Sequence, residues 1–134
     1  MIRYMLDTNI CIYLIKRKPR EVLERFNTLG RGDVGISTIT LSELEFGVNK
    51  SSKPQQNEVA LIHFVAELEI LSYGRAAAAQ YGPLRSYLES EGSPMGSLDT
   101  LIAAHALASG STLVTNNVSE FERVPDLPLE NWVN

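Results

Sequence analysis

Short apolar segments alternate with longer helix-forming segments along the chain, and this alternation constrains the fold more than any other feature. We predict strands at residues 3–7, 34–37, 69–71 and 112–115, with an edge strand near Leu129. Helices are predicted between them, at residues 9–15, 19–29, 40–48, 55–67, 75–91, 98–108 and 119–121. Short buried strands separated by helices are typical of a mainly parallel sheet. The sequence therefore predicts an α/β fold, a three-layer sandwich with helices flanking a central sheet, as one domain over residues 1–134.

Several side chains are expected to mark where helices begin or bend. Thr8 or Asn9 can cap the first helix, because a side-chain oxygen there accepts a hydrogen bond from a free backbone N–H. The segment from Thr40 to Glu43 has the spacing of a capping box and is expected to open the third helix. Gly82-Pro83 should kink or interrupt the long helix at residues 75–91.

Composition indicates a globular protein of a reducing compartment. Hydrophobic residues make up 44% and charged residues 21% of the chain. Cys11 is the single cysteine, which excludes an intrachain disulfide. No segment looks like a signal peptide or a membrane span, so we expect a cytoplasmic protein that does not contact a membrane.

The net charge of −4 argues against a broadly basic surface that binds nucleic acid passively. It does not argue against a nuclease, because such an enzyme can gather acids in one site and hold cations there. The densest basic run covers residues 16–20. Its cations can stabilise the end of a helix, or they can contact phosphates beside a site; the sequence leaves both interpretations open.

Acidic side chains follow the predicted strands in a pattern that favours one shared site. Asp7 ends the first strand, Glu43 is placed in the first turn of the helix after the second strand, and Asp99 in the first turn of another helix. Asn117 and Glu120 follow the strand at residues 112–115. Open parallel sheets bind ligands beyond the C-terminal ends of their strands. We therefore expect these side chains to meet at one edge of the sheet.

Each acid also has a purely structural interpretation. Asp7 can form a turn with Asn9, Glu43 can complete the capping box, and Asp99 can lie at the positive end of a helix dipole. Taken singly, each acid is weak evidence for a functional site. Together, Asp7 at the end of a strand and Glu43 and Asp99 at the starts of helices are much stronger evidence for one.

Three carboxylates at one locus repel each other unless a cation compensates them. Carboxylate and water ligands suit Mg²⁺ or Mn²⁺. Ligands for zinc are missing, since His63 and His105 fall inside predicted helices, where we expect core or surface roles.

Four segments resemble the PIN-domain family, and most of all the VapC toxins of bacterial toxin–antitoxin pairs. They read YMLDTN at residues 4–9, ISTITLSEL at 36–44, GSLDTLIAA at 96–104 and LVTNNVSEF at 113–121. The likeness extends to the ending at Trp132 and so covers nearly the whole chain. Four motifs in the family's order and spacing make a specific signal.

The resemblance implies a Mg²⁺- or Mn²⁺-dependent endoribonuclease toxin, with initiator transfer RNA as the expected substrate. Asp7, Glu43 and Asp99 match the family's three acids. A fourth acid often stands at the position of Asn117, which is an amide here. Either Glu120 supplies the missing charge, or the site works with three acids.

Roles follow from phosphodiester chemistry at a metal site. Asp7 and Asp99 are expected to bind the metal directly, while Glu43 binds it through water or orients the attacking water. Three polar side chains are expected to hydrogen-bond the carboxylates and hold them in place: Thr8, Thr115 and Asn117. Attack by water should leave a 5′-phosphate and a 3′-hydroxyl.

The first helix carries an unbroken apolar run at residues 10–15. Such a helix must be covered on more than one side, either by the domain itself or by a partner. The resemblance implies a VapB-like antitoxin as that partner, beside a toxin homodimer. We expect the first two helices to form part of the antitoxin's groove, so that a charge at Tyr13 or Leu14 releases the antitoxin.

Two other classes of protein begin with an aspartate after a first strand. A phosphatase of the haloacid dehalogenase type usually has a second aspartate two residues on, where this chain has Asn9. A receiver-type signalling module needs adjacent acids there and a phosphoacceptor aspartate in mid-chain. Neither pattern is present, and both classes remain as alternatives to the ribonuclease.

Overall fold

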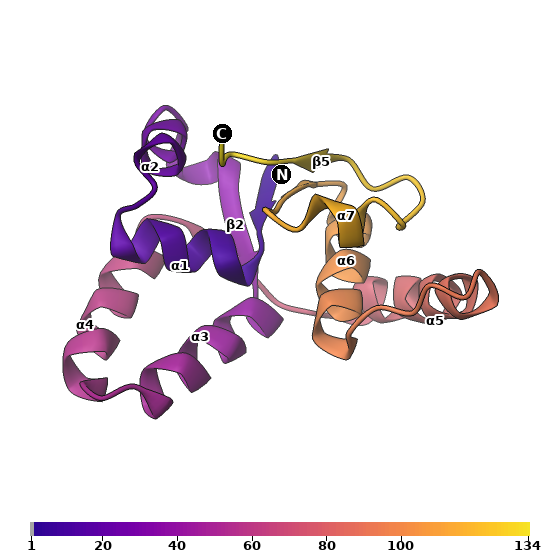
Figure 1. Ribbon diagram of the computed structural model, residues 1–134, viewed down its shortest axis with the longest axis horizontal. Coiled ribbons are helices and arrows are strands. Elements are labelled where there is room, and N and C mark those ends of the chain that lie inside the picture. Colours follow the sequence, from indigo (N-terminus) through magenta and orange to yellow (C-terminus); the bar gives the residue numbers. More distant parts are fainter. Residues whose placement is uncertain (1) are drawn as a thin grey trace.

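The computed structural model describes residues 2–134. They form three layers, a five-stranded sheet with a layer of helices on each face (Figure 1). The strand order is β3-β2-β1-β4-β5, and every pairing is parallel. The mainly parallel sheet expected from the sequence is confirmed. The strands are β1 (Tyr4–Leu6), β2 (Val34–Ser37), β3 (Glu69–Leu71), β4 (Thr112–Val114) and β5 (Leu129–Glu130).

Helices cover both faces of the sheet. One face is packed by α1 (Thr8–Lys16), α2 (Arg20–Asn27), α3 (Thr38–Lys50) and α4 (Pro54–Val65). The other is packed by α5 (Arg75–Ser90) and α6 (Ser97–Ser109), with the short α7 (Val118–Phe121) nearby. A 3-10 turn, η1 (Arg31–Asp33), precedes β2.

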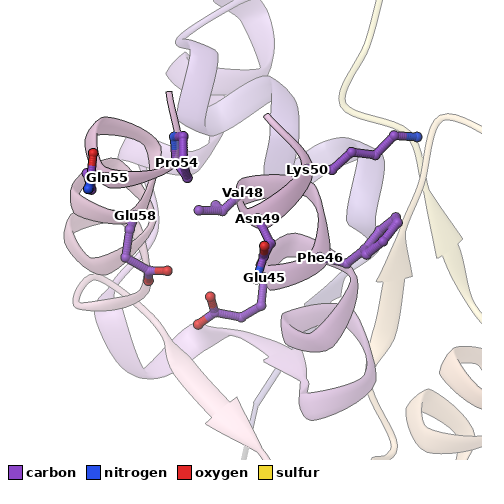
Figure 2. Close-up of a pocket in the computed structure, with 8 residues that line it drawn as sticks. All are labelled: Glu45, Phe46, Val48, Asn49, Lys50, Pro54, Gln55 and Glu58. Carbon is purple, nitrogen blue, oxygen red and sulfur yellow. The ribbon is translucent and has the colours of Figure 1, made fainter. Parts of the chain in front are cut away.

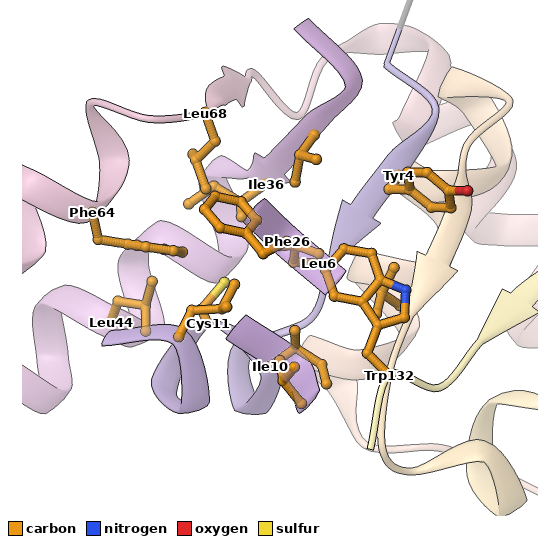
Figure 3. Packing of buried hydrophobic residues seen from close by; sticks show 14 of the residues in the cluster. Tyr4, Leu6, Ile10, Cys11, Phe26, Ile36, Leu44, Phe64, Leu68 and Trp132 are labelled. Atoms are coloured by element: carbon orange, nitrogen blue, oxygen red, sulfur yellow. The ribbon is translucent and has the colours of Figure 1, made fainter. Parts of the chain in front are cut away.

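Successive residues of β1 divide the core into two clusters, because side chains alternate across a strand. Leu6 points into the cluster beneath α1–α4, where Ile36 and Phe64 join it (Figure 3). Met5 points into the opposite cluster beneath α5 and α6. Both side chains are fully buried. Burying a side chain of this size stabilises the fold by about 1.5–3 kcal/mol, so both helical layers are tied to the central strand.

The strand order creates a switch point beside β1. The chain leaves β1 for β2 on one side and later returns to β4 on the other. The segments that follow β1 and β4 therefore diverge, and the space between them lies at the C-terminal edge of the sheet. Ligand sites of open α/β sheets lie at such points.

Helix α5 runs through Pro83 as one helix from Arg75 to Ser90, so the expected interruption at Gly82-Pro83 is wrong. Proline removes one helical hydrogen bond and leaves the carbonyl of Ala79 without its donor. Both Pro83 and Ala79 are exposed, so water can reach that carbonyl. Leu84 and Leu88 are buried in the α6-side cluster and hold the helix along its length.

The C-terminal tail is fastened to α2 by an aromatic cluster. The Arg25 guanidinium donates to the Tyr4 hydroxyl over 3.1 Å and lies 5.4 Å and 5.6 Å from the ring centroids of Tyr4 and Trp132. Trp132 Nε1 donates to Glu130 over 2.8 Å, and its ring meets Tyr4 edge-on. The cluster therefore ties β5 and the tail to α2 and to the start of β1.

Across residues 2–134, no helix combines the length and the apolar character that crossing a membrane requires.

Candidate active site

Asp7 lies directly after β1 and is almost fully buried, with 5% of its surface exposed. Its Oδ1 accepts the Ile10 N–H over 3.0 Å and so caps α1, in place of the expected Thr8 or Asn9. Its Oδ2 accepts the Thr115 hydroxyl over 2.6 Å. Burial raises the pKa of Asp7, and the nearby Glu43 charge raises it further, against the lowering effect of these hydrogen bonds. Capping therefore accounts for one carboxylate oxygen, and the second faces the switch point.

Glu43 lies in the second turn of α3, so its interpretation as a capping-box residue is wrong. The helix begins at Thr38, and Ser37 caps it by accepting the Ile39 N–H over 3.0 Å. Ser37 leaves β2 in an extended conformation that suits a cap, which moves the helix start earlier than the capping-box pattern predicts. The Glu43 Oε1 accepts the Thr8 hydroxyl over 2.5 Å instead. This bond holds Glu43 against the first turn of α1, beside Asp7.

Asp99 lies in the first turn of α6, where the helix dipole favours a charged carboxylate. Its pKa is nevertheless raised to about 7. The largest cause is burial, followed by the charge and hydrogen-bonding proximity of Glu120 and then by the charges of Glu43 and Asp7. All four acids therefore lie within electrostatic reach of one another.

Asn117 connects β4 to the fourth acid. Its side-chain Nδ2 donates to Glu120 Oε2 over 2.6 Å, and its backbone N–H donates to the Thr115 hydroxyl over 2.9 Å. The Thr115 hydroxyl in turn donates to Asp7. Each of the three polar residues expected to hold a carboxylate therefore donates to one: Thr8 to Glu43, Thr115 to Asp7 and Asn117 to Glu120.

Within the part of the chain that the structure describes, no basic side chain forms an ion pair with any of the four acids, Asp7, Glu43, Asp99 and Glu120. Oxygen-rich, uncompensated carboxylates fit a hard divalent cation. In the described part of the chain, no three acidic, histidine or cysteine side chains are already drawn together around a single ion position. The donor set fits the ion by its chemistry, because carboxylate oxygens are the ligands that Mg²⁺ and Mn²⁺ prefer.

The two histidines occupy a surface and a core position, which are the roles expected of them. His63 is exposed on α4, and His105 is buried on α6. Burial lowers the pKa of His105, so its imidazole is neutral near pH 7.

A groove begins at Glu43, where α1, α3 and α4 line it with mainly apolar side chains, and continues along α1 and α4 to a more polar part lined by Arg17, Asn27 and Glu67. Its first hollow, of about 410 Å³, is lined by Ile12, Glu43 and Leu61 among others. Its second, of about 300 Å³, lies between α1, α2 and α4. Ile15 and Ala60 line both hollows, so the two hollows are neighbours, and we refer to them together as the groove. The part played by α4 was missed at the sequence level, where only the apolar run of α1 signalled a groove.

The positions expected to control this groove need correction. Leu14 is a core residue with 4% exposure, so a charge there would unfold the protein rather than only block a partner. Tyr13 lines neither hollow, and its hydroxyl accepts a hydrogen bond from Asn116 over 3.3 Å. Ala60 is small, partly exposed and common to both hollows, which makes it the better position.

Another hollow, of about 620 Å³, lies in the α3–α4 hairpin and contains none of the four acids (Figure 2). The carboxylates of Glu45 and Glu58 point toward each other across it. Hydrogen bonding with Glu58 raises the pKa of Glu45. Glu43 lies on the same helix as Glu45, but it does not line this hollow.

Comparison with known proteins identifies relatives over nearly the full chain. The PIN domain family model matches residues 4–127. A Shigella flexneri protein named tRNA(fMet)-specific endonuclease VapC is 47% identical over 132 residues, covering 98% of this chain and 99% of the relative.

Solved structures agree with that likeness. VapBC2 from Rickettsia felis, bound to a DNA fragment from its promoter, contains a chain 46% identical with a TM-score of 0.93, covering 99% of this chain and 100% of the relative. DNA-bound VapBC from Salmonella typhimurium contains a chain 44% identical with a TM-score of 0.94, with the same coverage.

Proposed function

The chain belongs to the PIN-domain family, as one of its VapC ribonucleases, and on that premise we propose that it cleaves initiator transfer RNA at the acidic cluster with Mg²⁺ or Mn²⁺ bound there. The observation that carries this proposal is the group of four carboxylates at the switch point, none of which forms an ion pair with a basic side chain within residues 2–134. Family membership selects this activity over the phosphatase and the receiver module.

Asp7 and Asp99 are the residues that would hold the metal. Asp7 is fixed on both oxygens by α1 and Thr115, and the pKa of Asp99 is raised to about 7. When bound, the metal supplies a water of lowered pKa and polarises a phosphoryl oxygen. Asp99 must release its proton to become a ligand, so metal binding and proton release are coupled at this residue.

Glu43 would orient the attacking water. Thr8 occupies its Oε1, which leaves the second oxygen to accept a hydrogen bond from that water. Water attack on the phosphorus breaks the bond to the leaving 3′-oxygen, which takes up a proton. The products are a 5′-phosphate and a 3′-hydroxyl.

Glu120 would supply the fourth acid in place of the amide at Asn117. It lies close enough to Asp99 to raise the pKa of that carboxyl, and Asn117 holds its Oε2 at 2.6 Å. In this arrangement Glu120 is the fourth acid, and Asn117, which stands where relatives often have that acid, holds Glu120 by a hydrogen bond.

The substrate class rests on the Shigella flexneri relative, whose name specifies tRNA(fMet). The test is to incubate the purified protein and Mg²⁺ with initiator tRNA and, separately, with elongator methionine tRNA. We expect the initiator to be cut and the elongator to be spared. Equal cleavage of both would contradict the substrate, and cleavage of neither would contradict the activity.

The groove is the place we assign to an antitoxin. Relatives from Rickettsia felis and Salmonella typhimurium are VapBC complexes. The mainly apolar part of the groove ends at Glu43, so a segment lying there needs apolar side chains and a basic group where it reaches the acids. Such a segment would block the site by supplying the positive charge that the metal otherwise provides.

Changing Ala60 to glutamate should weaken antitoxin binding at least about tenfold, equivalent to about 1.4 kcal/mol, because the new charge is desolvated against apolar side chains. Gln56→Glu is the matched control, since Gln56 is exposed on the same helix and lines neither hollow. Calorimetric titration with the cognate antitoxin measures both affinities. RNA cleavage should persist in both variants. Unchanged antitoxin affinity for Ala60→Glu would place the antitoxin elsewhere.

A further inference from the structure

A buried hydrogen bond joins the helix that carries Asp99 to the start of the helix that carries Glu43. His105 Nδ1 on α6 lies 2.8 Å from Ser37 Oγ at the end of β2. Ser37 is fully buried and His105 is 5% exposed. A buried imidazole loses its hydrogen bonds to water, and the hydrogen bond to Ser37 offsets part of that free-energy cost.

Ser37 has two tasks at this point. Its Oγ caps α3 by accepting the Ile39 N–H over 3.0 Å, and the same oxygen meets His105. The ring of Tyr73 packs edge-on against His105, with centroids 5.5 Å apart, and the Tyr73 N–H donates to Thr38 Oγ1 over 3.1 Å. The segment before α5, the first turn of α3 and the middle of α6 therefore meet around this imidazole.

The hydrogen bond between His105 and Ser37 lies equally far along each helix from the acid that the helix carries. Glu43 follows Ser37 by six residues, and Asp99 precedes His105 by six residues. Six helical residues span about 9 Å. A rotation of α6 against α3 by about 6° around this contact would thus move one carboxylate by about 1 Å relative to the other. Errors of that size at a reacting centre can cost about 100-fold in rate.

We propose that His105 is a positioning residue which, through its hydrogen bond to Ser37, fixes α6 against α3 and so sets the spacing of Asp99 and Glu43. The inference rests on the proposed function, because the spacing matters only if these acids share a metal ion. A histidine that merely fills the core would be replaceable by an apolar side chain of similar size with no effect on the acids.

The test measures Mn²⁺ affinity calorimetrically on the RNA-free protein, so that it does not depend on activity. His105→Leu removes the hydrogen bond while keeping an apolar body, and we expect it to weaken Mn²⁺ binding by about 10- to 100-fold. His105→Asn keeps a polar group where Nδ1 lies, and it should recover most of that loss. His63→Leu is the matched control, because His63 is exposed on α4, and it should leave the affinity unchanged.

Ser37→Ala tests the same bond from its other end. It should also weaken Mn²⁺ binding. Because Ser37→Ala removes the α3 cap as well as the bond to His105, the double variant with His105→Leu should lose little more than Ser37→Ala alone. Circular dichroism establishes that each variant is folded. If His105→Leu does not fold, Ser37→Ala and His105→Asn decide the question.

Wild-type Mn²⁺ affinity in folded His105→Leu or in folded Ser37→Ala would overturn the inference while leaving the metal site in place. An equal loss in the leucine and asparagine variants would also overturn it. A wild-type protein that binds no Mn²⁺ would overturn the proposed metal site, and this inference with it.

Discussion

Replacing Asp99 by asparagine should abolish RNA cleavage while making the metal-free protein more stable above pH 7. Cleavage should fall by at least about 1000-fold, because the variant loses a metal ligand on which the chemistry depends. Stability should rise because the wild-type carboxylate is half-buried near Glu120, Glu43 and Asp7, and the amide carries no charge. Loss of activity would then not reflect loss of fold.

The pH dependence of stability provides the control for this variant. Asp99 has a pKa of about 7 in the folded protein against 3.8 in the reference state, so the folded protein binds the extra proton between these values. Its contribution is therefore fully present below about pH 4 and is lost as the pH rises through about 7. Denaturant unfolding in chelator should show this decline in the wild type and a flatter profile in Asp99→Asn. An active, folded Asp99→Asn would remove this residue from the site.

Asp7→Asn should be equally inactive and should remain folded. Asparagine caps a helix about as well as aspartate, so the start of α1 survives. Removing the charge also relieves the cost of burying it, which is the main reason that the pKa of Asp7 is raised.

Replacing Glu120 by glutamine should slow cleavage by a large factor, about 100-fold, whereas Asn117→Ala should slow it less. Glu120 supplies charge beside Asp99, and Asn117 supplies only a hydrogen bond that holds Glu120. Such supporting bonds are typically worth about 10-fold or more in activity. Single-turnover cleavage with saturating Mg²⁺ compares the two.

The Mg²⁺ concentration needed for cleavage distinguishes a loss of negative charge at the site from a loss of side-chain positioning. If Glu120 contributes charge, Glu120→Gln should need more Mg²⁺ for half-maximal rate than Asn117→Ala does. Wild-type cleavage by Glu120→Gln would leave a site of three acids and would make the Asn117–Glu120 pair a purely structural contact.

The sheet and the meeting of the acids could be predicted because they follow from local patterns. A buried strand ending in Asp7 and a second ending before Asn117 have to bring these residues to one edge once the strands are parallel. The three hydroxyl and amide donors were predicted for the same reason. Thr8 is the second residue after β1, Thr115 directly follows β4, and Asn117 comes two residues after Thr115.

The remaining features depend on tertiary contacts. Ser37 outcompetes the capping-box pattern at Thr40 because its position at the end of β2 already supplies the extended backbone of a cap. Pro83 is tolerated because the carbonyl it leaves free is exposed and Leu84 and Leu88 anchor the helix. Helix α4 lines the groove through Ala60, and an alanine in a helical sequence gives no indication that it lines a binding site. The bond between Ser37 and His105 spans 68 residues and has no local pattern that reveals it.

The most direct test of the account is to follow cleavage of initiator tRNA in excess chelator, then after adding back Mg²⁺ or Mn²⁺, and to identify the ends of the fragments. The acidic cluster predicts no cleavage in chelator, recovery with either metal, and fragments that carry a 5′-phosphate and a 3′-hydroxyl. Full cleavage in chelator, or fragments ending in a 2′,3′-cyclic phosphate, would contradict hydrolysis by metal-activated water at Asp7, Glu43 and Asp99.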